Sequence, residues 1–302
     1  MEVYSELKEI PNLSLALGFF DGLHLGHQAV ISCAVDFARN NGKKSAMITF
    51  KSHPSNILSD NPVKYIIRKS EKYEMLEELG LDYVIELDFA SIYKMSPHEY
   101  LKNILVKYFS PVAISTGFNH KFGADQSGDV SFLADNQVVY NYLYFGTPHQ
   151  DVYGQIISSS AIRRAISNGD FYLVSSMLGR KFNVRGEVVH GNHVGRTIGY
   201  PTANIVYPDV LVPPKYGVYD VSVHLPDGRM SRGLANFGVK PTVSDNLNTP
   251  ILEIYLLDFD GDLYGQNINV EFTKFIRLER KFASLEELKS QIDQDLCNLI
   301  LL

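Results

Sequence analysis

The spacing of the apolar residues changes near residue 180, and this change constrains the fold more than any other feature of the chain. Before it, short apolar runs alternate with segments of helical period, which is typical of a parallel sheet covered by helices. After it, apolar and polar residues alternate one by one, as in antiparallel strands with one buried face. At 302 residues the chain is long enough for two such domains, 1–180 and 181–302, with the boundary near 180–184.

The first half is expected to be an open, doubly wound, Rossmann-like α/β domain. Its helical stretch at 97–109 has a clear start, because Ser96 can cap it, Pro97 suits the first helical position and Glu99 completes a capping box. Ligands of such sheets bind beyond the carboxyl ends of the strands. The predicted strands are 13–19, 46–50, 83–87 and 112–115, and the other predicted helices are 28–39 and 71–79.

The second half is expected to be an antiparallel β-barrel or sandwich closed by one helix. Strict alternation is clearest at 221–225, 252–256 and 268–272, with turn residues at 226–228 and 260–261. In the closing helix, Ser284 and Glu287 form a potential capping box. The buried stripe of this helix is predicted to be Leu285, Leu288, Ile292, Leu296 and Leu299.

Charge and cysteine content exclude several classes of protein. A formal net charge of −6 and a pI of about 5.8 argue against a general nucleic-acid or anionic-membrane binder. Cys33 and Cys297 are the only cysteines, which supports neither a disulfide framework nor a zinc site. The first residues lack the basic and apolar regions of a signal peptide, and no apolar run is long enough to cross a membrane. We therefore expect a cytoplasmic protein.

Residues 18–27, Gly-Phe-Phe-Asp-Gly-Leu-His-Leu-Gly-His, lie where a predicted strand gives way to a helix. Such a turn presents unpaired backbone N–H groups and the positive end of a helix dipole, which together bind phosphate. His24 and His27 are three residues apart and would share one helix face. A lone histidine on a helix is usually structural, but this pair can donate hydrogen bonds to charge that builds on an α-phosphate during adenylyl transfer.

Three other segments of the first half follow predicted strands or begin helices. Ser158–Arg163 offers hydroxyls, N–H groups and a guanidinium to triphosphate oxygens, although by itself a serine-rich helix cap is the better explanation. Asn119, with aromatic and glycine neighbours at 116–123, can hold a planar ligand, but by itself this segment is only a loop. Residues 49–54 are likewise a turn by default.

The densest motif of the second half is 186–204. Its glycines, Gly191, Gly195 and Gly199, allow a backbone to fold closely around phosphates, although a flexible surface loop has the same composition. Thr202 and Asn204 lie on one side of an extended segment. Their hydroxyl and amide oxygens are ligands that suit Mg²⁺ bridging nucleotide phosphates.

Glu253 lies on the polar face of a predicted strand, between Leu252 and Ile254. A carboxylate there is usually just solvated, but if it faces a ligand it can accept the proton of an attacking alcohol. Segment 236–242, which begins with Asn236, and Arg277 can line the same pocket.

Taken in order, these motifs resemble the bacterial bifunctional riboflavin kinase/FMN adenylyltransferase family, also called the FAD synthetases. The resemblance covers nearly the whole chain, and its most specific part runs from Gly195-Arg196 through Pro201-Thr202-Ala203-Asn204. Two positions depart from the family pattern: Ser160 replaces the usual threonine and keeps its hydroxyl, and His120 stands where an aromatic residue is expected. The other matching segments are 18–27, 50–54, 119–123, 158–163, 215–219, 236–242 and 253–265.

The resemblance implies two reactions. The barrel would transfer the γ-phosphate of ATP to riboflavin, giving FMN and ADP, with Glu253 as base and Thr202 and Asn204 on Mg²⁺. The first domain would join FMN to a second ATP, giving FAD and pyrophosphate, with His24 and His27 stabilising the transition state. It implies no nucleic-acid or membrane partner, and the oligomeric state stays open.

The resemblance also implies binding residues for each substrate. The flavin-binding residues would be His53, Pro54, Asn119 and Phe122 in the first domain and Asn236 and Arg277 in the second. Those that bind nucleotide would be Gly18, Phe20, Asp21, Gly22, Gly26, Ser159, Ser160 and Arg163 in the first domain and Gly191, Gly195, Arg196, Gly199 and Pro201 in the second.

Two alternatives differ in what is active. In one, only the kinase works and the first domain is a non-catalytic nucleotide-binding remnant, but the intact histidine pair and Ser-Ser-Ser-x-Ile-Arg segment argue against it. In the other, the protein is a non-enzymatic flavin-binding regulator. Glu253, Thr202 and Asn204 argue against that, because a regulator needs neither a base nor metal ligands.

Overall fold

The structure, a computed structural model, describes residues 1–59, 62–191, 194–239 and 250–300. Its contacts divide the chain into two compact units, Met1–Ser159 and Ser160–Leu302. Two helices that precede the barrel, α8 (Ser159–Asn168) and α9 (Phe171–Leu178), therefore group almost entirely with the second unit. The domain boundary that the change in apolar spacing indicates, near 180–184, stays a prediction.

The first unit contains a six-stranded sheet in the order β1-β4-β3-β2-β5-β6, in which every pair is parallel. The four predicted strands are confirmed as β2, β3, β4 and β5. The edge strands were missed, because β1 has only three residues and β6 is largely half-buried or exposed and lacks a continuous apolar run. The strands are β1 Glu2–Tyr4, β2 Leu13–Leu17, β3 Lys44–Phe50, β4 Tyr83–Leu87, β5 Ala113–Gly117 and β6 Leu143–Thr147.

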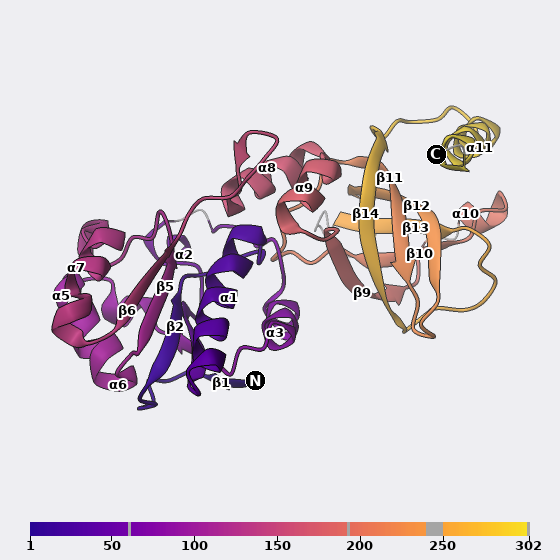
Figure 1. Ribbon diagram of the computed structural model, residues 1–302. Coiled ribbons are helices and arrows are strands. Elements are labelled where there is room, and N and C mark those ends of the chain that lie inside the picture. Colours follow the sequence, from indigo (N-terminus) through magenta and orange to yellow (C-terminus); the bar gives the residue numbers. More distant parts are fainter. Residues whose placement is uncertain (60–61, 192–193, 240–249, 301–302) are drawn as a thin grey trace. The chain divides into compact units, whose positions relative to one another are not determined.

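Helices cover both faces of this sheet, so the predicted doubly wound arrangement is confirmed (Figure 1). Leu15 of β2 belongs to the core under the helical stretch 97–109, whereas its neighbour Ala16 packs with α1 and α3 on the opposite face. The helices are α1 Leu25–Asn40, α2 Ser55–Leu58, α3 Lys69–Glu78, α4 Phe89–Ile92, α5 Pro97–Tyr100, α6 Lys107–Phe109 and α7 Val130–Tyr140. A 3₁₀ turn at Ala124–Gln126 and the hairpin β7 (Asp151–Val152) and β8 (Gln155–Ile156) complete the unit.

The helical stretch at 97–109 begins as its sequence predicts. Ser96 N–H donates to Glu99 Oε2 at 2.8 Å, and Glu99 N–H donates back to Ser96 Oγ at 3.3 Å, which is a full capping box. The stretch is not one regular α-helix, because Leu101–Val106 between α5 and α6 is a π-helix. Apolar spacing could not reveal this change, since Leu101, Ile104 and Leu105 stay buried in either form.

The second unit is a closed antiparallel barrel in the strand order β10-β13-β12-β11-β14-β9, which decides between barrel and sandwich. Alternate strand residues fill its interior, among them Val221, Ile254 and Phe272, and Phe171 of α9 stacks on Phe272 with ring centroids 4.8 Å apart. The strands are β9 Asn183–Val189, β10 Thr202–Val206, β11 Gly217–His224, β12 Met230–Val239, β13 Pro250–Leu256 and β14 Asn267–Arg277.

The closing helix is α11, Leu285–Ile300, and a short helix, α10, spans Val194–Thr197 (Figure 1). Ser284 Oγ accepts from Glu287 N–H at 3.2 Å, but the Glu287 carboxylate accepts from Ala283 N–H, so only half of the predicted capping box forms. Leu299 is buried against the barrel as predicted. The prediction for Leu285 was wrong: it is 48% exposed, because it is the first residue of the helix and lies outside the packed stripe.

Candidate functional site

A strained turn joins β2 to α1 at the carboxyl edge of the parallel sheet. Phe20 and Leu23 have φ angles of 57° and 42°, in the left-handed region that non-glycine residues rarely adopt, and Gly22 has 83°. Each non-glycine residue in this region costs of order 1–3 kcal/mol. No side chain fits at Gly18, where a Cβ atom would lie 2.9 Å from the Phe20 ring. The turn therefore needs contacts from outside to hold its shape.

Hydrogen bonds from other segments supply such contacts. The buried Asp21 carboxylate accepts from Ile66 N–H at 3.1 and 3.2 Å. Ser159 Oγ donates to the Asp21 carbonyl at 3.0 Å, and Lys72 Nζ donates to the Phe19 carbonyl at 3.2 Å. Two residues predicted to bind nucleotide, Asp21 and Ser159, thus support the turn itself.

The two histidines form one stacked pair at the start of α1. His24 is the N-cap residue rather than part of the helix, and its Nδ1 accepts from His27 N–H at 3.2 Å. The imidazole rings lie 3.5 Å apart between centroids with an angle of 19°, and Phe20 meets His27 edge-on at 5.2 Å. A Cβ atom on Gly26 would lie 3.3 Å from the His24 ring, so glycine leaves room for the stack. The pair therefore sits at the positive end of a helix of 16 residues.

The remaining predicted residues of the first domain lie on three segments. Ser160 and Arg163 follow Ser159 in α8 but fall in the second unit. His53 is half-buried, meets Phe19 edge-on at 4.8 Å and accepts from Ser55 N–H at 3.2 Å, while Pro54 is the N-cap of α2.

The loop after β5 divides into an exposed and a packed part. Asn119 is exposed, as a ligand contact requires. Phe122 packs against Tyr100 and Phe132 and stacks with His120 at 5.7 Å, so its ring anchors the loop to the core. Burial lowers the pKa of His120 to about 4, so this imidazole is neutral at physiological pH.

In the barrel, the strand register gathers four of the predicted site residues into one row. Glu253 of β13 lies opposite Asn204 of β10 on one side and Asn236 of β12 on the other. Val218 of β11 then lies opposite both Asn236 and Arg277 of β14. Because directly opposed residues share a face, this row lies on the outside of the barrel wall, opposite the buried interior side chains.

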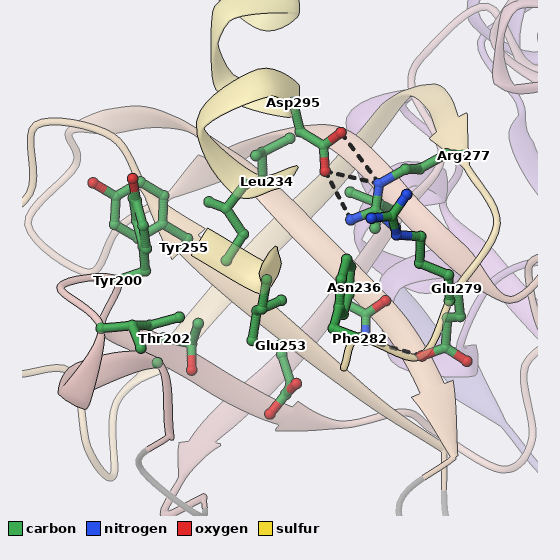
Figure 2. Close-up of a pocket in the computed structure, with 16 residues that line it drawn as sticks. Tyr200, Thr202, Leu234, Asn236, Glu253, Tyr255, Arg277, Glu279, Phe282 and Asp295 are labelled. Atoms are coloured by element: carbon green, nitrogen blue, oxygen red, sulfur yellow. Dashed lines mark hydrogen bonds and ion pairs between the residues drawn. The ribbon is translucent and has the colours of Figure 1, made fainter. Parts of the chain in front are cut away.

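A cavity of about 490 Å³ opens along this row, under α11 (Figure 2). Gly195, Thr202, Asn236, Glu253 and Arg277 line it, as the predictions for these residues require. Asn204 does not line it: it is buried at the wall, where a Cβ atom on Gly191 would lie 2.5 Å from the Asn204 amide nitrogen. Residues that the sequence analysis had not singled out also line the cavity, among them Tyr200, Tyr255, Glu279, Phe282 and Asp295.

Acidic side chains hold both predicted flavin-binding residues of this cavity. Asp295 reaches down from α11 to meet Arg277 (Figure 2), accepting from Nε at 2.9 Å and from Nη2 at 2.8 Å. Asn236 Nδ2 donates to Glu279 Oε1 at 3.0 Å. The Asp295 side chain is only 3% exposed, so its charge depends on Arg277 for compensation.

At the end of the glycine-rich segment, residues 195–200 fold tightly beside β10, and Tyr200 bonds to α11. Tyr200 N–H donates to the Gly195 carbonyl at 2.8 Å, and a Cβ atom on Gly195 would lie 2.2 Å from the Tyr200 carbonyl oxygen. The Tyr200 hydroxyl donates to Asp293 of α11, which together with burial raises the pKa of Tyr200 to about 12. Tyr200 also meets Tyr255 edge-on at 5.1 Å.

Three more residues of this segment were predicted to bind nucleotide: Gly199, Pro201 and Arg196. Gly199 has a φ of 89°, and Pro201 is exposed. Arg196 lies in α10, but its side chain is outside what the structure describes, as are residues 240–242 of the predicted segment 236–242.

Neither a metal cluster nor a membrane span is found in the described residues. No group of three or more His, Cys, Asp and Glu among them could hold a metal ion. In the same ranges, no helix has both the length and the apolar character that crossing a membrane requires.

Sequence reasoning missed Asp295 and Lys72. Asp295 had a usable signal, because it falls three residues after Ile292 on the apolar stripe of the closing helix, where a carboxylate needs a partner. Lys72 had none, since its neighbours come from distant segments.

Comparison with known proteins finds two family models that match separate parts of the chain. The family model for riboflavin kinase matches residues 178–300, and that for FAD synthetase matches residues 7–161. A bifunctional riboflavin kinase/FMN adenylyltransferase of Listeria monocytogenes is 37% identical over 94% of this chain and 90% of its own length. This chain belongs to that family.

Other members and one solved structure extend the likeness. The bifunctional riboflavin kinase/FMN adenylyltransferase of Bacillus subtilis is 34% identical over 93% of this chain and 89% of its own length. A crystal structure from Streptococcus pneumoniae, of a protein named macrolide-efflux protein, superposes with a TM-score of 0.86 at 28% identity and covers 97% of both chains. The predicted family resemblance and the fold of both domains are thereby confirmed.

Proposed function

We propose that this member of the riboflavin kinase/FMN adenylyltransferase family makes FMN and then FAD at two separate sites. The barrel uses the cavity beside Glu253, and the first unit uses the histidine pair at the start of α1. The observation that carries the proposal is the row of Asn204, Glu253 and Asn236 across three neighbouring strands. This row places one carboxylate between two amides, beside a cavity whose volume suits an organic ligand.

In the kinase step, Glu253 accepts the proton of the ribityl 5′-hydroxyl as that oxygen attacks the γ-phosphorus of ATP. The bond from the γ-phosphorus to the bridging oxygen breaks, and ADP leaves. Asn236 and Arg277 position the flavin on the side away from Asn204, and the glycine-rich segment from Gly191 to Gly199 holds the phosphates.

Thr202 and Asn204 fit a magnesium ion by the chemistry of their donors. Both offer neutral oxygen atoms from the same strand, and Gly191 lets the backbone approach the Asn204 amide more closely than any side chain would allow. A magnesium ion held by these two residues would supply positive charge to offset that of the nucleotide phosphates.

In the adenylyl step, an FMN phosphate oxygen attacks the α-phosphorus of a second ATP, and pyrophosphate leaves. His24 and His27 donate hydrogen bonds to the charge that develops on the α-phosphate, at the positive end of α1. Gly18, Phe20, Gly22 and Gly26 shape the turn, while His53, Pro54, Asn119 and the Phe122 loop receive the flavin. The triphosphate-binding role of Ser160 and Arg163, which belong to the second unit, stays a prediction. We place both reactions in the cytoplasm, with riboflavin, FMN, FAD, ATP, ADP and pyrophosphate as substrates and products.

Incubation with riboflavin, ATP and Mg²⁺, followed over time by chromatography, tests the proposal. We expect FMN to accumulate first and FAD afterwards, and both to stop when the magnesium is chelated. Absence of FMN from wild-type protein would overturn the proposal. FMN without FAD, even when FMN itself is supplied, would favour the alternative in which only the kinase is active.

A further inference from the structure

A small cavity of about 90 Å³ lies at the carboxyl ends of β2, β3 and β4, next to the turn that precedes the histidines. Its charged lining consists of Asp21, Lys51, Lys69, Lys72 and Glu86. Among these lysines Lys72 is buried, at 6% exposure, whereas Lys51 and Lys69 are exposed. A buried ammonium is costly, so what it contacts is informative.

The hydrogen bond of Lys72 goes to the turn. Its Nζ donates to the Phe19 carbonyl at 3.2 Å and lies 4.9 Å from the centre of the Phe19 ring. The nearby carboxylates are engaged by other groups: Asp21 accepts from Ile66 N–H, and Glu86 pairs with Lys69 at 2.5 Å. Lys72 therefore bonds to the backbone of the turn, and the two carboxylates affect its pKa only through space.

We propose that Lys72 is a positioning residue for adenylyl transfer, because it fixes the Phe19 carbonyl and thereby the turn that presents His24 and His27. The inference rests on the proposed function of the first unit. The turn contains two non-glycine residues in the left-handed region, so it keeps its shape only through such contacts. The other donor to the same carbonyl, Thr49 Oγ1, is longer at 3.4 Å and uncharged, and charge-assisted hydrogen bonds are about twice as strong as neutral ones.

The charge of Lys72 gives the proposal a second readout. Burial lowers the pKa of Lys72 to about 8, against the opposing effects of Asp21 and Glu86, and Lys69 lowers it further. Tyr73, which packs near both lysines, stays neutral in this range because burial and Glu86 raise its pKa. Above about pH 8 the free enzyme thus loses the ammonium that holds the turn.

The first experiment replaces Lys72 by methionine, which keeps most of the apolar stem and removes the donor. Conversion of FMN to FAD and of riboflavin to FMN are measured in the same preparation. We expect the kcat of the FAD step to fall about tenfold to a hundredfold, since displacement of a reacting group by about 1 Å costs about that much. The KM values for ATP and FMN should change less than about twofold, which also shows that the first unit is folded, and the kinase rate should not change.

The matched control is Lys69→Met, which removes a cation from the same cavity that does not bond to the turn. Its kcat at pH 7 should stay close to that of the wild type. In the wild type, kcat/KM of the FAD step should fall above about pH 8. This fall should be absent in Lys72→Met and should move to higher pH in Lys69→Met, because Lys69 lowers the pKa of Lys72.

The outcomes distinguish failure of the proposed function from failure of the role proposed for Lys72. Wild-type protein that makes no FAD from FMN overturns the proposed function. Wild-type protein that makes FAD, together with a Lys72→Met variant that keeps its kcat or loses only substrate affinity, overturns the role of Lys72 alone. An alkaline limb that stays in place in both variants overturns it as well.

Discussion

The two proposed sites of this chain are built in different ways. The adenylyltransferase site is concentrated in one turn and the helix start that follows it, with His24 and His27 three residues apart. The kinase site is spread over strands distant in sequence, with Asn204, Glu253 and Asn236 meeting only through the barrel register. The first arrangement places groups through local backbone geometry, and the second through long-range pairing, so different substitutions should disturb each.

The two sites also differ in the interactions that stabilise them. The turn before α1 is kept in a strained shape by hydrogen bonds that include those from Ile66, Lys72 and Ser159. The kinase cavity is held by α11, through the ion pair of Arg277 with Asp295 and the hydrogen bond of Tyr200 with Asp293. If the two sites are independent, each can be damaged without loss of the other.

The largest expected effect is that of Glu253→Gln, which keeps the size of the side chain and removes the base. FMN formation should fall by about 10²–10⁴-fold, the usual contribution of a positioned general base. Conversion of supplied FMN to FAD should not change, because Glu253 lies in the second unit. Both rates are read by chromatography, and a folded variant that loses both would contradict the separation of the sites.

His27→Ala should produce the mirror image, with a fall of about 10²–10³-fold in FAD formation and an unchanged kinase rate. His24→Ala should impair the same step and also lower the stability of the first unit by about 1 kcal/mol, since its Nδ1 caps α1. Thermal unfolding of the two variants distinguishes these roles. Equal stability of both variants would show that the cap contributes nothing.

Arg277→Met should destabilise the barrel unit, because it leaves the Asp295 carboxylate buried without its cation. We expect the free energy of unfolding to fall by about 2–3 kcal/mol. This is less than the usual cost of breaking a buried ion pair, because the Arg277 side chain is still 21% exposed. The double variant Arg277→Met, Asp295→Leu should recover most of it. Chemical denaturation measures both, and a double variant less stable than the single one would contradict this account of α11.

The smallest effect concerns the pH dependence of stability in the first unit. The pKa of Lys72 is about 8 in the folded chain and near 10.5 when unfolded, so between these values the unfolded state binds more protons. Stability attributable to Lys72 should therefore rise from pH 8 to 10.5. The difference between wild type and Lys72→Met, followed by far-ultraviolet circular dichroism, should show this rise, and a difference that falls with pH would refute it.

Local features of both domains could be predicted from the sequence, and long-range ones could not. The buried strands, the Ser96 capping box and the histidine pair follow from neighbouring residues, and the structure confirms their formation. That Glu253 faces a cavity depends on which strand lies beside β13, and the role of α11 depends on where it packs. The exposed Leu285 shows the same limit, since apolar spacing indicates a face but not how far it is covered.

Mixing the two inactive variants tests the independence of the sites most directly. Glu253→Gln and His27→Ala proteins are each incubated with riboflavin, ATP and Mg²⁺, alone and together, and FAD is measured. Neither should make FAD at an appreciable rate alone. The mixture should make it, because FMN released by the intact kinase of one variant diffuses to the intact histidine pair of the other. A mixture that forms FMN but no FAD would contradict the account of two separate sites.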